Sequence, residues 1–330
     1  MKAISVVVPI YNEEETLYEL YTRLTASLEL SFSDMDQQIV FIDDGSTDRS
    51  QEILKKYAEH DNRITIICFS RNFGHQIAIS AGLDHAIGDY VVMMDGDLQD
   101  RPEDIVHLYN KLKEGYDVVY SERLEKKFSW FKRLTAYCFI KILRFLVSDR
   151  IVINNHVFRI MKKKVVQAVV SLRENQRFIV GLIGWVGFKH TGLPLKHAER
   201  KYGETKYGIF AQIKLATNAL CSFSTYPLKL ITHLGFFIMA ISFSLGLFIV
   251  VRHFVYGGHV HGWSSLIVSI LCMGGVQLFS LGIIGEYIGR SYIEQKQRPL
   301  YVLSEVVNNK KIVSELKMYA SSKMQVHHVN

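Results

Sequence analysis

Short apolar runs alternate with longer amphipathic stretches over the first 120 residues of this 330-residue chain. The short runs are rich in β-branched residues and are bounded by turn-forming residues, which is typical of buried strands. We expect strands at residues 4–8, 38–42, 64–69, 90–94 and 118–120, and helices at residues 14–28, 47–59, 76–86 and 102–114. Strand–helix alternation predicts an α/β fold in which helices cover a mostly parallel sheet.

Two later segments, residues 228–251 and 264–287, are apolar over a length sufficient to cross a bilayer. Apart from Lys229 and His233 the first contains no residue that carries a charge, and the second contains none before Glu286. We therefore predict a hairpin of two transmembrane helices. Lysine and arginine flank the hairpin, whereas its loop contains only Arg252. The positive-inside rule then places both chain ends in the cytoplasm.

A further pattern spans residues 129–147, where basic residues recur at helical spacing beside an aromatic and aliphatic face. We interpret it as a helix lying in the membrane interface. An ordinary amphipathic helix packed on the soluble domain is the alternative. The predicted organisation is a cytosolic domain over residues 1–209, a juxtamembrane amphipathic helix over 210–227, the hairpin over 228–288 and a cytosolic tail over 289–330.

The overall charge narrows the class of partner. The chain has a net charge of +7. Next to apolar segments, a positive excess favours an anionic membrane surface over nucleic acid. The four cysteines are scattered without a Cys-x-x-Cys pair, which argues against zinc sites and disulfides. The first residues lead directly into the first strand, so no signal peptide is expected.

Polar clusters follow four of the expected strands. They are Asn12-Glu13, Asp43-Asp44-Gly45-Ser46, Ser70-Arg71-Asn72 and residues 95–100. Ligands of parallel α/β sheets bind at the carboxyl ends of the strands. The coincidence of the four positions predicts a single site at that edge.

Asp95, Asp97 and Gln99 alternate along the last of these clusters. If the chain stays extended there, their side chains share one face. Clustered carboxylates repel one another unless a cation lies among them, and oxygen ligands favour a hard divalent ion such as Mg²⁺ or Mn²⁺. Such an ion neutralises the charge on a departing diphosphate. An acid-rich turn without metal is the alternative.

The cluster after the second strand has both a structural and a binding interpretation. We expect Ser46 or Asp44 to cap the helix over residues 47–59. Asp43 is then left to accept a hydrogen bond from a base N–H or a ribose hydroxyl. The other expected donor contacts are a pocket wall formed by Pro9, Tyr11 and Glu13, and a cation for the donor phosphate at Arg71. A surface ion pair is the alternative for Arg71.

These clusters together resemble the family-2 glycosyltransferases of GT-A fold. The matching segments are residues 7–13 (Val-Val-Pro-Ile-Tyr-Asn-Glu), 43–48 (Asp-Asp-Gly-Ser-Thr-Asp), 70–74 (Ser-Arg-Asn-Phe-Gly) and 95–100 (Asp-Gly-Asp-Leu-Gln-Asp). Within that family the chain is similar to the polyprenyl-phosphate sugar synthases, the group of dolichyl-phosphate mannose synthase and bactoprenol glucosyltransferase. Residues 174–188, residues 200–207 and the hairpin match the bactoprenol branch.

The resemblance implies an activity and a location. It implies inverting transfer of a sugar, with glucose the first choice, from a UDP-sugar to undecaprenyl or another polyprenyl phosphate. The product would serve cell-envelope glycan modification. The reaction would occur at the cytosolic face of the bacterial inner membrane, and the protein would be a homo-oligomer, with a tetramer implied.

The resemblance also implies roles for matching positions. The ligands of Mg²⁺ or Mn²⁺ would be Asp95, Asp97 and Gln99. The nucleoside would be held by Pro9, Tyr11, Glu13 and Asp43. The donor and acceptor phosphates would be met by Arg123, Arg200 and Lys206, with Arg133 added at the acceptor. Asp97, Arg123, Arg200 and Lys206 form the implied catalytic set. A phosphate monoester has a second pKa of about 6, so the acceptor is largely dianionic at neutral pH and needs little help from a base.

One position departs from the family pattern. Relatives carry an acidic residue in an Asp-x-Gly-x-Phe-Arg pattern where this chain has Asn154. Because an amide stands there, one alternative function is that of a membrane scaffold that binds nucleotide sugar but is catalytically impaired. A processive polysaccharide synthase is the other alternative, although such enzymes carry more spanning helices and a Gln-x-x-Arg-Trp motif, whereas Arg177 here precedes Phe178.

Overall fold

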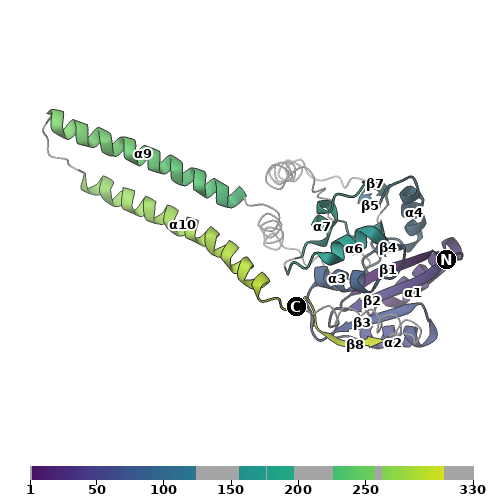
Figure 1. The fold of residues 1–330 in the computed structure, drawn as a ribbon. Helices are drawn as coiled ribbons and strands as arrows, with labels where there is room; N and C mark the ends of the chain where they lie inside the picture. The colour runs from purple at the N-terminus through teal and green to yellow at the C-terminus, as the bar shows by residue number, and fades with distance from the viewer. Residues whose placement is uncertain (1, 124–155, 176, 197–225, 257–261, 308–330) are drawn as a thin grey trace, which may run out of the picture. The chain divides into compact units, whose positions relative to one another are not determined.

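A computed structural model describes residues 2–123, 156–175, 177–196, 226–256 and 262–307 of the chain (Figure 1). The chain divides into two compact units. The first comprises residues 1–138, 149–208 and 299–330, and the second comprises residues 139–148 and 209–298. The predicted interfacial segment 129–147 and most of the predicted segment 210–227 lie outside the described residues.

The first unit is built on a sheet whose described strands run in the order β7-β5-β6-β4-β1-β2-β3-β8 (Figure 1). Their bounds are β1 (Ala3–Ile10), β2 (Asp36–Asp43), β3 (Ile64–Phe69), β4 (Tyr90–Met93), β5 (Val118–Arg123), β6 (Arg159–Lys162), β7 (His190–Leu195) and β8 (Leu303–Val307). The neighbours β4, β1, β2 and β3 are parallel, as predicted. Strand β6 is antiparallel to β4 and β5, and β8 is antiparallel to β3. The sheet therefore has a parallel centre with antiparallel additions.

Helices cover both faces of this sheet. Their bounds in the first unit are α1 (Leu17–Ser31), α2 (Ser50–His60), α3 (His75–His85), α4 (Ile105–Lys113), α6 (Lys163–Ser171) and α7 (Ile179–Trp185). The predicted helix over residues 102–114 begins as a 3₁₀ turn, η1 (Pro102–Asp104), because proline is well tolerated at the first helical position. Helix α3 lies directly on β1 and β2: a Cβ atom on Gly82 would be 2.2 Å from Val7 Cγ1 and 2.7 Å from Ile42 Cδ1.

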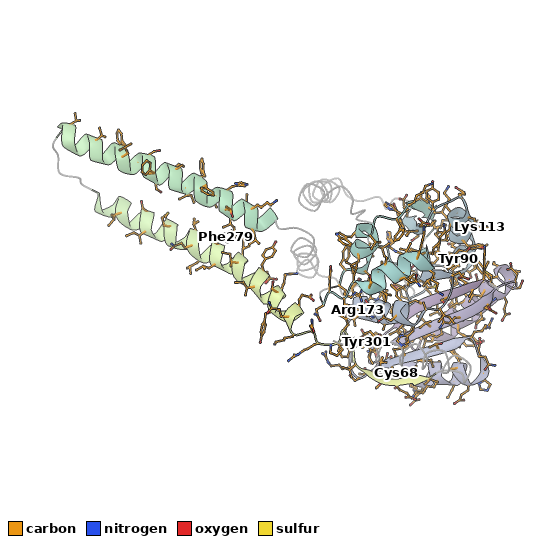
Figure 2. The ribbon with its side chains drawn as sticks, in the orientation of Figure 1. Cys68, Tyr90, Lys113, Arg173, Phe279 and Tyr301 are labelled. Carbon is orange, nitrogen blue, oxygen red and sulfur yellow. The ribbon has the colours of Figure 1, made fainter. Side chains whose placement is uncertain are left out.

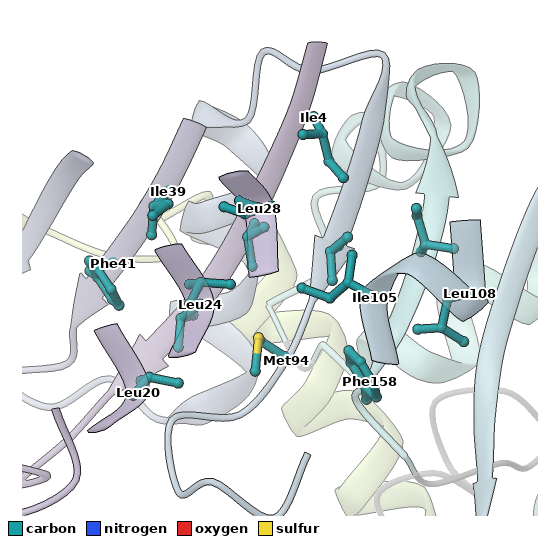
Figure 3. Close-up of a cluster of buried hydrophobic side chains, with 14 of the residues drawn as sticks. Ile4, Leu20, Leu24, Leu28, Ile39, Phe41, Met94, Ile105, Leu108 and Phe158 are labelled. Atoms are coloured by element: carbon teal, nitrogen blue, oxygen red, sulfur yellow. The ribbon is translucent and has the colours of Figure 1, made fainter. Parts of the chain in front are cut away.

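The opposite face of the sheet forms the main core. Leu20, Leu24 and Leu28 recur every fourth residue along α1 and pack in one cluster with Ile39 and Phe41 of β2 (Figure 3). All five side chains are fully buried. Alternate residues of β1 and β2 thus face α1 or α3, which explains why these strands are apolar throughout.

The second unit contains two long helices, α9 (Tyr226–Tyr256) and α10 (Trp263–Gln295). They contain the two predicted transmembrane segments. Within the described residues, Leu228–Leu245 is the segment long and apolar enough to cross a membrane, and none of it is buried. Large apolar side chains on both helices are exposed, including Phe243 and Phe279, the latter labelled in Figure 2. Exposed apolar surface of this extent is typical of a face that contacts lipid or protein.

The segment predicted as a tail contains regular structure. Helix α10 continues to Gln295, beyond the predicted boundary at 288, and Leu303–Val307 form β8 on the edge of the sheet. The assignment of residues 289–330 as a cytosolic tail stays a prediction. Strand β8 was not expected, because a five-residue strand containing Ser304 and Glu305 has too weak an apolar pattern to be recognised by itself.

Candidate functional site

Four loops meet at one edge of the sheet. They follow β1, β2, β3 and β4, which are parallel neighbours, so their carboxyl ends lie at the same edge. The prediction that the four polar clusters lie at one edge of the sheet is confirmed.

Asn12 joins the loops after β1 and β2. Its backbone is in the left-handed region at φ 53°, which asparagine tolerates better than most residues. The Thr47 N–H donates to Asn12 Oδ1 at 2.8 Å, and the Asn12 N–H donates to Ser46 Oγ at 3.0 Å. Sequence reasoning gave Asn12 no specific role, because its partners lie more than thirty residues away.

Asp43 and Asp44 are buried, with exposed fractions of 2% and 3%. Asp43 Oδ1 accepts the Ser46 N–H at 3.1 Å, whereas Asp44 accepts the N–H groups of Phe73 at 2.7 Å and Gly74 at 3.0 Å. Burial raises the pKa of both carboxyls above the ordinary range, and these hydrogen bonds partly oppose the shift. Asp44 therefore ties the end of β2 to the loop before α3.

The capping prediction for the second helix was wrong. Helix α2 begins at Ser50, and the Ser50 N–H donates to Asp48 Oδ1 at 3.0 Å. Ser46 and Asp44, the two predicted caps, instead bond to Asn12 and to the loop before α3. Residues 47–49 are thus used to connect loops rather than to extend the helix.

Gly45 brings Arg71 beside these carboxylates. Gly45 has φ +69°, and a Cβ atom there would be 2.6 Å from the Arg71 carbonyl carbon and 2.7 Å from the Asn72 nitrogen. The exposed Arg71 side chain donates from Nη1 to the Asn72 carbonyl oxygen at 3.1 Å and stacks on Phe73, with Cζ 4.1 Å from the ring centroid. No carboxylate pairs with Arg71 in the part of the chain that the structure describes. The surface ion pair considered above is therefore not observed.

The acidic loop after β4 is not extended. Residues 96–97 form a turn, and Leu98 has φ 60°. The condition of an extended chain, under which the three side chains would share one face, is therefore not met. Burial nonetheless alternates: the predicted ligands Asp95, Asp97 and Gln99 are partly exposed, whereas the three residues between and after them are buried. A Cβ atom on Gly96 would be 2.6 Å from Ile10 Cδ1, so the loop presses on the end of β1.

The donor atoms of this loop are compatible with a hard cation. Asp97 Oδ1 accepts the Gln99 N–H at 3.1 Å, and Asp95 Oδ1 lies 3.3 Å from His75 Nε2. Among the described residues, no three His, Cys, Asp or Glu side chains are arranged as a complete metal site. Two carboxylates and an amide are nevertheless the oxygen donors that Mg²⁺ takes when substrate phosphates complete its coordination. The residues fit an ion that binds together with a diphosphate.

The remaining predicted donor residues lie around the same edge. Pro9 is buried in β1, in register with Ile42, and the Tyr11 side chain that follows is 41% exposed. Glu13 Oε2 accepts a hydrogen bond from Thr16 Oγ1 at 3.0 Å. The structure places these residues at the same sheet edge as Asp43 and Arg71.

The predicted acceptor cations are only partly described. Arg123 is the last residue of β5, in register with Leu195 of β7. Since β5 and β4 are both antiparallel to β6, Arg123 lies at the same sheet edge as the four loops. Arg133, Arg200 and Lys206 lie outside the described residues, as does Asn154.

Arg159 is a buried cation that sequence reasoning assigned no role. It is 3% exposed, begins β6 and lies in register with Met93 just before the acidic loop. Its Nε donates to the Val157 carbonyl at 3.3 Å, and an Nη2 hydrogen bond reaches the His156 carbonyl. Burial lowers the pKa of Arg159 to about 10, so the guanidinium stays charged at neutral pH. Its place after Val157-Phe158 in the motif that contains Asn154 was the available signal.

Comparisons with known proteins match both units. Glycosyl transferase family 2 matches residues 5–170, and the GtrB C-terminal hairpin matches residues 226–291. The uncharacterized glycosyltransferase YkcC of Bacillus subtilis is 41% identical over 317 residues, which cover 95% of this chain and 98% of the relative. The bactoprenol glucosyl transferase of Shigella phage SfV is 40% identical over 301 residues, covering 91% of this chain and 97% of the relative.

This chain is also similar to a relative from Escherichia coli and to a solved structure. The prophage bactoprenol glucosyl transferase homolog of Escherichia coli is 38% identical over 304 residues, covering 92% of this chain and 99% of the relative. The match to the crystal structure of S. aureus TarS 1–349 in complex with UDP-GlcNAc covers 67% of this chain and 66% of the TarS chain. The two are 16% identical in sequence, with a TM-score of 0.47.

Proposed function

The chain belongs to glycosyl transferase family 2, and we propose that it transfers glucose from UDP-glucose to a polyprenyl phosphate at the cytosolic face of a bacterial membrane. Family membership confirms the resemblance inferred from the motifs. The observation that carries the proposal is that identity to the bactoprenol glucosyl transferase of phage SfV extends over 91% of the chain, and so over both units. The product would be a lipid-linked sugar for modification of cell-envelope glycans.

The donor nucleoside is proposed to lie over the ends of β1 and β2. Pro9, Tyr11, Glu13 and Asp43 form its pocket, and the partly exposed Tyr11 ring offers an apolar face to the base. Arg71 faces the donor phosphates. A planar guanidinium suits this role because it bonds two phosphate oxygens at once.

The donor diphosphate is proposed to meet the acidic loop after β4. Asp95, Asp97 and Gln99 hold Mg²⁺ or Mn²⁺ there. When bound, the ion supplies charge neutralisation at the departing UDP. The loop itself is fixed against β1 at Gly96, which limits how far its carboxylates move when the donor binds.

The acceptor phosphate is proposed to bind among Arg123, Arg133, Arg200 and Lys206. One of its oxygens attacks the anomeric carbon, the bond from that carbon to the UDP oxygen breaks, and UDP leaves with inversion. A dianionic phosphate has no proton to lose, so alignment and charge screening are the protein's main contributions. This chemistry accommodates Asn154 where relatives carry an acid.

The membrane segments are proposed to deliver the lipid. Residues 129–147 and 210–227 lie in the interface, and the hairpin over residues 228–288 anchors the cytosolic domain of residues 1–209. Both termini are then cytosolic, and the protein is a homotetramer. Cysteine labelling of intact cells at each terminus tests the topology, and native mass spectrometry of solubilised protein tests the assembly.

A panel of nucleotide sugars tests the function. Membranes containing the protein are incubated with undecaprenyl phosphate, Mg²⁺ or Mn²⁺ and labelled UDP-glucose, UDP-N-acetylglucosamine or UDP-galactose, and label is measured in the lipid extract. The proposal expects most product from UDP-glucose and none with Asp97→Asn. Absence of lipid product from every sugar would contradict it, and preference for another sugar would correct the donor.

A further inference from the structure

The segment after helix α10 returns to the sheet beside the donor loop. We call residues 299–307 the exit strand, since they follow α10 and end in β8. The Ser70 N–H donates to the Val302 carbonyl at 3.0 Å, one residue before Arg71. Lys55 Nζ lies 2.6 Å from Glu305 Oε2 farther along the strand. The exit strand therefore borders β3, the strand that leads into the loop carrying Arg71.

Three aromatic rings connect the exit strand to Arg71. Tyr301 stacks on Phe69, with centroids 5.1 Å apart and planes at 18°. Phe69 meets Phe73 edge to face, with centroids 5.5 Å apart and planes at 83°. The Arg71 guanidinium then lies 4.1 Å from the Phe73 centroid. We call Tyr301, Phe69 and Phe73 the aromatic column.

The column is fixed at both ends. The Tyr301 hydroxyl donates to Asp84 Oδ2 at 2.9 Å, and Arg173 Nη1 donates to the same oxygen at 2.8 Å; Figure 2 labels Tyr301 and Arg173. Burial is the main cause that raises the pKa of Tyr301, and the negative charge of Asp84 raises it further. The hydroxyl therefore keeps its proton at neutral pH. At the other end, the Phe73 N–H donates to the buried Asp44. This bond fixes the Phe73 backbone, and the edge-to-face contact with Phe69 orients the Phe73 ring beside Arg71.

Arg71 needs such support to bind phosphate well. A long exposed side chain loses conformational entropy when a ligand immobilises it, and pre-organisation reduces that cost. Cation–π contact with a fixed ring provides the pre-organisation.

We propose that Tyr301 is a positioning residue for the donor site, acting on Arg71 through Phe69 and Phe73. This inference rests on the proposed role of Arg71 in donor binding. It also gives the chain that leaves the hairpin a function: its first residues on the sheet support the donor cation. Tyr301 itself is not expected to touch UDP-glucose.

A double-mutant cycle tests the inference. UDP affinity is measured by calorimetry for the full-length, detergent-solubilised wild type, Tyr301→Leu, Arg71→Ala and the double variant, in Mn²⁺. Loss of one stacked pair predicts that Tyr301→Leu weakens UDP binding about 3- to 10-fold. In the Arg71→Ala background the same change is expected to have no further effect. In turnover assays the KM for UDP-glucose rises with Tyr301→Leu, whereas the KM for the lipid acceptor does not.

Two control variants separate positioning from general destabilisation. Tyr301→Phe keeps the stacked ring and removes the hydroxyl, so it is expected to restore UDP affinity to within about 2-fold of wild type. Tyr57→Leu removes another stacked pair, Tyr21–Tyr57 with centroids 4.3 Å apart, and within the described residues neither ring contacts Arg71. It is expected to lower the melting temperature without changing UDP affinity.

The outcomes distinguish this inference from the proposed function. Equal weakening by Tyr301→Leu in both backgrounds, or no weakening at all, overturns the positioning role while leaving glycosyl transfer intact. Failure of Tyr301→Phe to restore affinity also contradicts the column. Absence of lipid product from wild-type protein with every nucleotide sugar overturns the proposed function, and the UDP-binding cycle still reports on Tyr301 and Arg71.

Discussion

Two acidic loops of similar sequence differ in what their carboxylates do. Asp43, the last residue of β2, and Asp44 after it precede a glycine, and the loop after β4 contains Asp95 and Asp97 around one. The first pair is buried and accepts backbone N–H groups from its own loop and the next one. The second pair is partly exposed. The comparison teaches that burial, rather than the number of carboxylates, distinguishes carboxylates that join loops from carboxylates that face outward.

The difference follows from the place of each strand. Strand β2 lies between β1 and β3, and the loops of both neighbours bond to its carboxyl end through Asn12 and Phe73. The loop after β4 packs Gly96 on Ile10, and its polar side chains Asp95, Asp97 and Gln99 are partly exposed. The first loop is expected to affect folding and activity together, and the second to affect activity alone.

Asp97→Asn is expected to have the largest effect. Asparagine keeps an oxygen for the Gln99 N–H but removes the charge that would bind a divalent ion. Lewis-acid stabilisation is worth several kcal/mol, so the rate of lipid-linked sugar formation is expected to fall about 100-fold or more. The melting temperature should stay within about 2 °C of wild type, because a stability change below about 0.5 kcal/mol is usual for substitutions away from buried networks. A large loss of stability would mean that this loop also builds the fold.

Asp44→Ala is expected to reduce both stability and transfer. It leaves the N–H groups of Phe73 and Gly74 without their acceptor and disconnects the β2 loop from the loop that carries Arg71. Unsatisfied buried groups predict a loss of about 2–4 kcal/mol in the free energy of unfolding, measured by urea denaturation. Asp44→Asn, which retains one acceptor oxygen, should lose less. Full stability of Asp44→Ala would remove the distinction between the two loops.

Gly45→Ala tests the close approach of the two loops. The new Cβ would lie 2.6 Å from the Arg71 carbonyl carbon, at a φ of +69°. We expect a loss of about 1–3 kcal/mol and weaker UDP binding, because Arg71 must move. Gly115→Ala is the matched control: its φ is +103°, but no atom lies within 4 Å of the new Cβ. Gly115→Ala should lose some stability and keep UDP affinity; equal UDP affinities of the two variants would contradict the contact.

The smallest expected effect is a difference in pH dependence between two buried carboxyls. Burial raises the pKa of Asp43 above its ordinary 3.8, so the folded state holds the proton more tightly than the unfolded state does. Asp43 therefore costs stability once the pH rises through the folded pKa, and Asp43→Asn should gain stability relative to wild type between pH 4 and 7.

Asp61 provides the opposite case. Burial tends to raise its pKa, but hydrogen bonds from Arg63 outweigh that effect and lower it below 3.8. Its stabilisation is present above the unfolded pKa and is lost as the pH falls through the folded pKa, so the deficit of Asp61→Asn should shrink below pH 4. Urea midpoints at pH 3, 4 and 7 measure both variants. Parallel curves for the two variants would contradict the assignment of opposite pKa shifts.

The sequence was sufficient to predict the parallel centre of the sheet and the edge at which the polar clusters gather. Strands β1 to β4 are apolar because both of their faces are covered, and polar clusters mark their carboxyl ends. Strands β6, β7 and β8 were missed. Each has four to six residues, and β7 contains Gly192 and Pro194, which argue against a strand except at an edge.

The partners of the site residues were harder to predict than the residues themselves. Asp44 was considered only as an alternative to Ser46 for a helix cap, and its acceptor role toward Phe73, 29 residues away, has no local signature. Tyr301 joins Phe69 across more than two hundred residues of chain, through a strand pairing that forms only in the folded protein. Local patterns therefore identified chemistry, whereas tertiary contacts decided which carboxylate is buried and which faces outward.

Calorimetric titration of UDP into purified protein, with Mn²⁺ and then with EDTA, tests the central claim most directly. The claim is that the partly exposed loop after β4 binds the donor diphosphate through a divalent ion. Wild type is expected to bind UDP only with Mn²⁺, and Asp97→Asn is expected not to bind it under either condition while remaining folded. Equal UDP affinity in Mn²⁺ and EDTA, or in wild type and Asp97→Asn, would contradict the account.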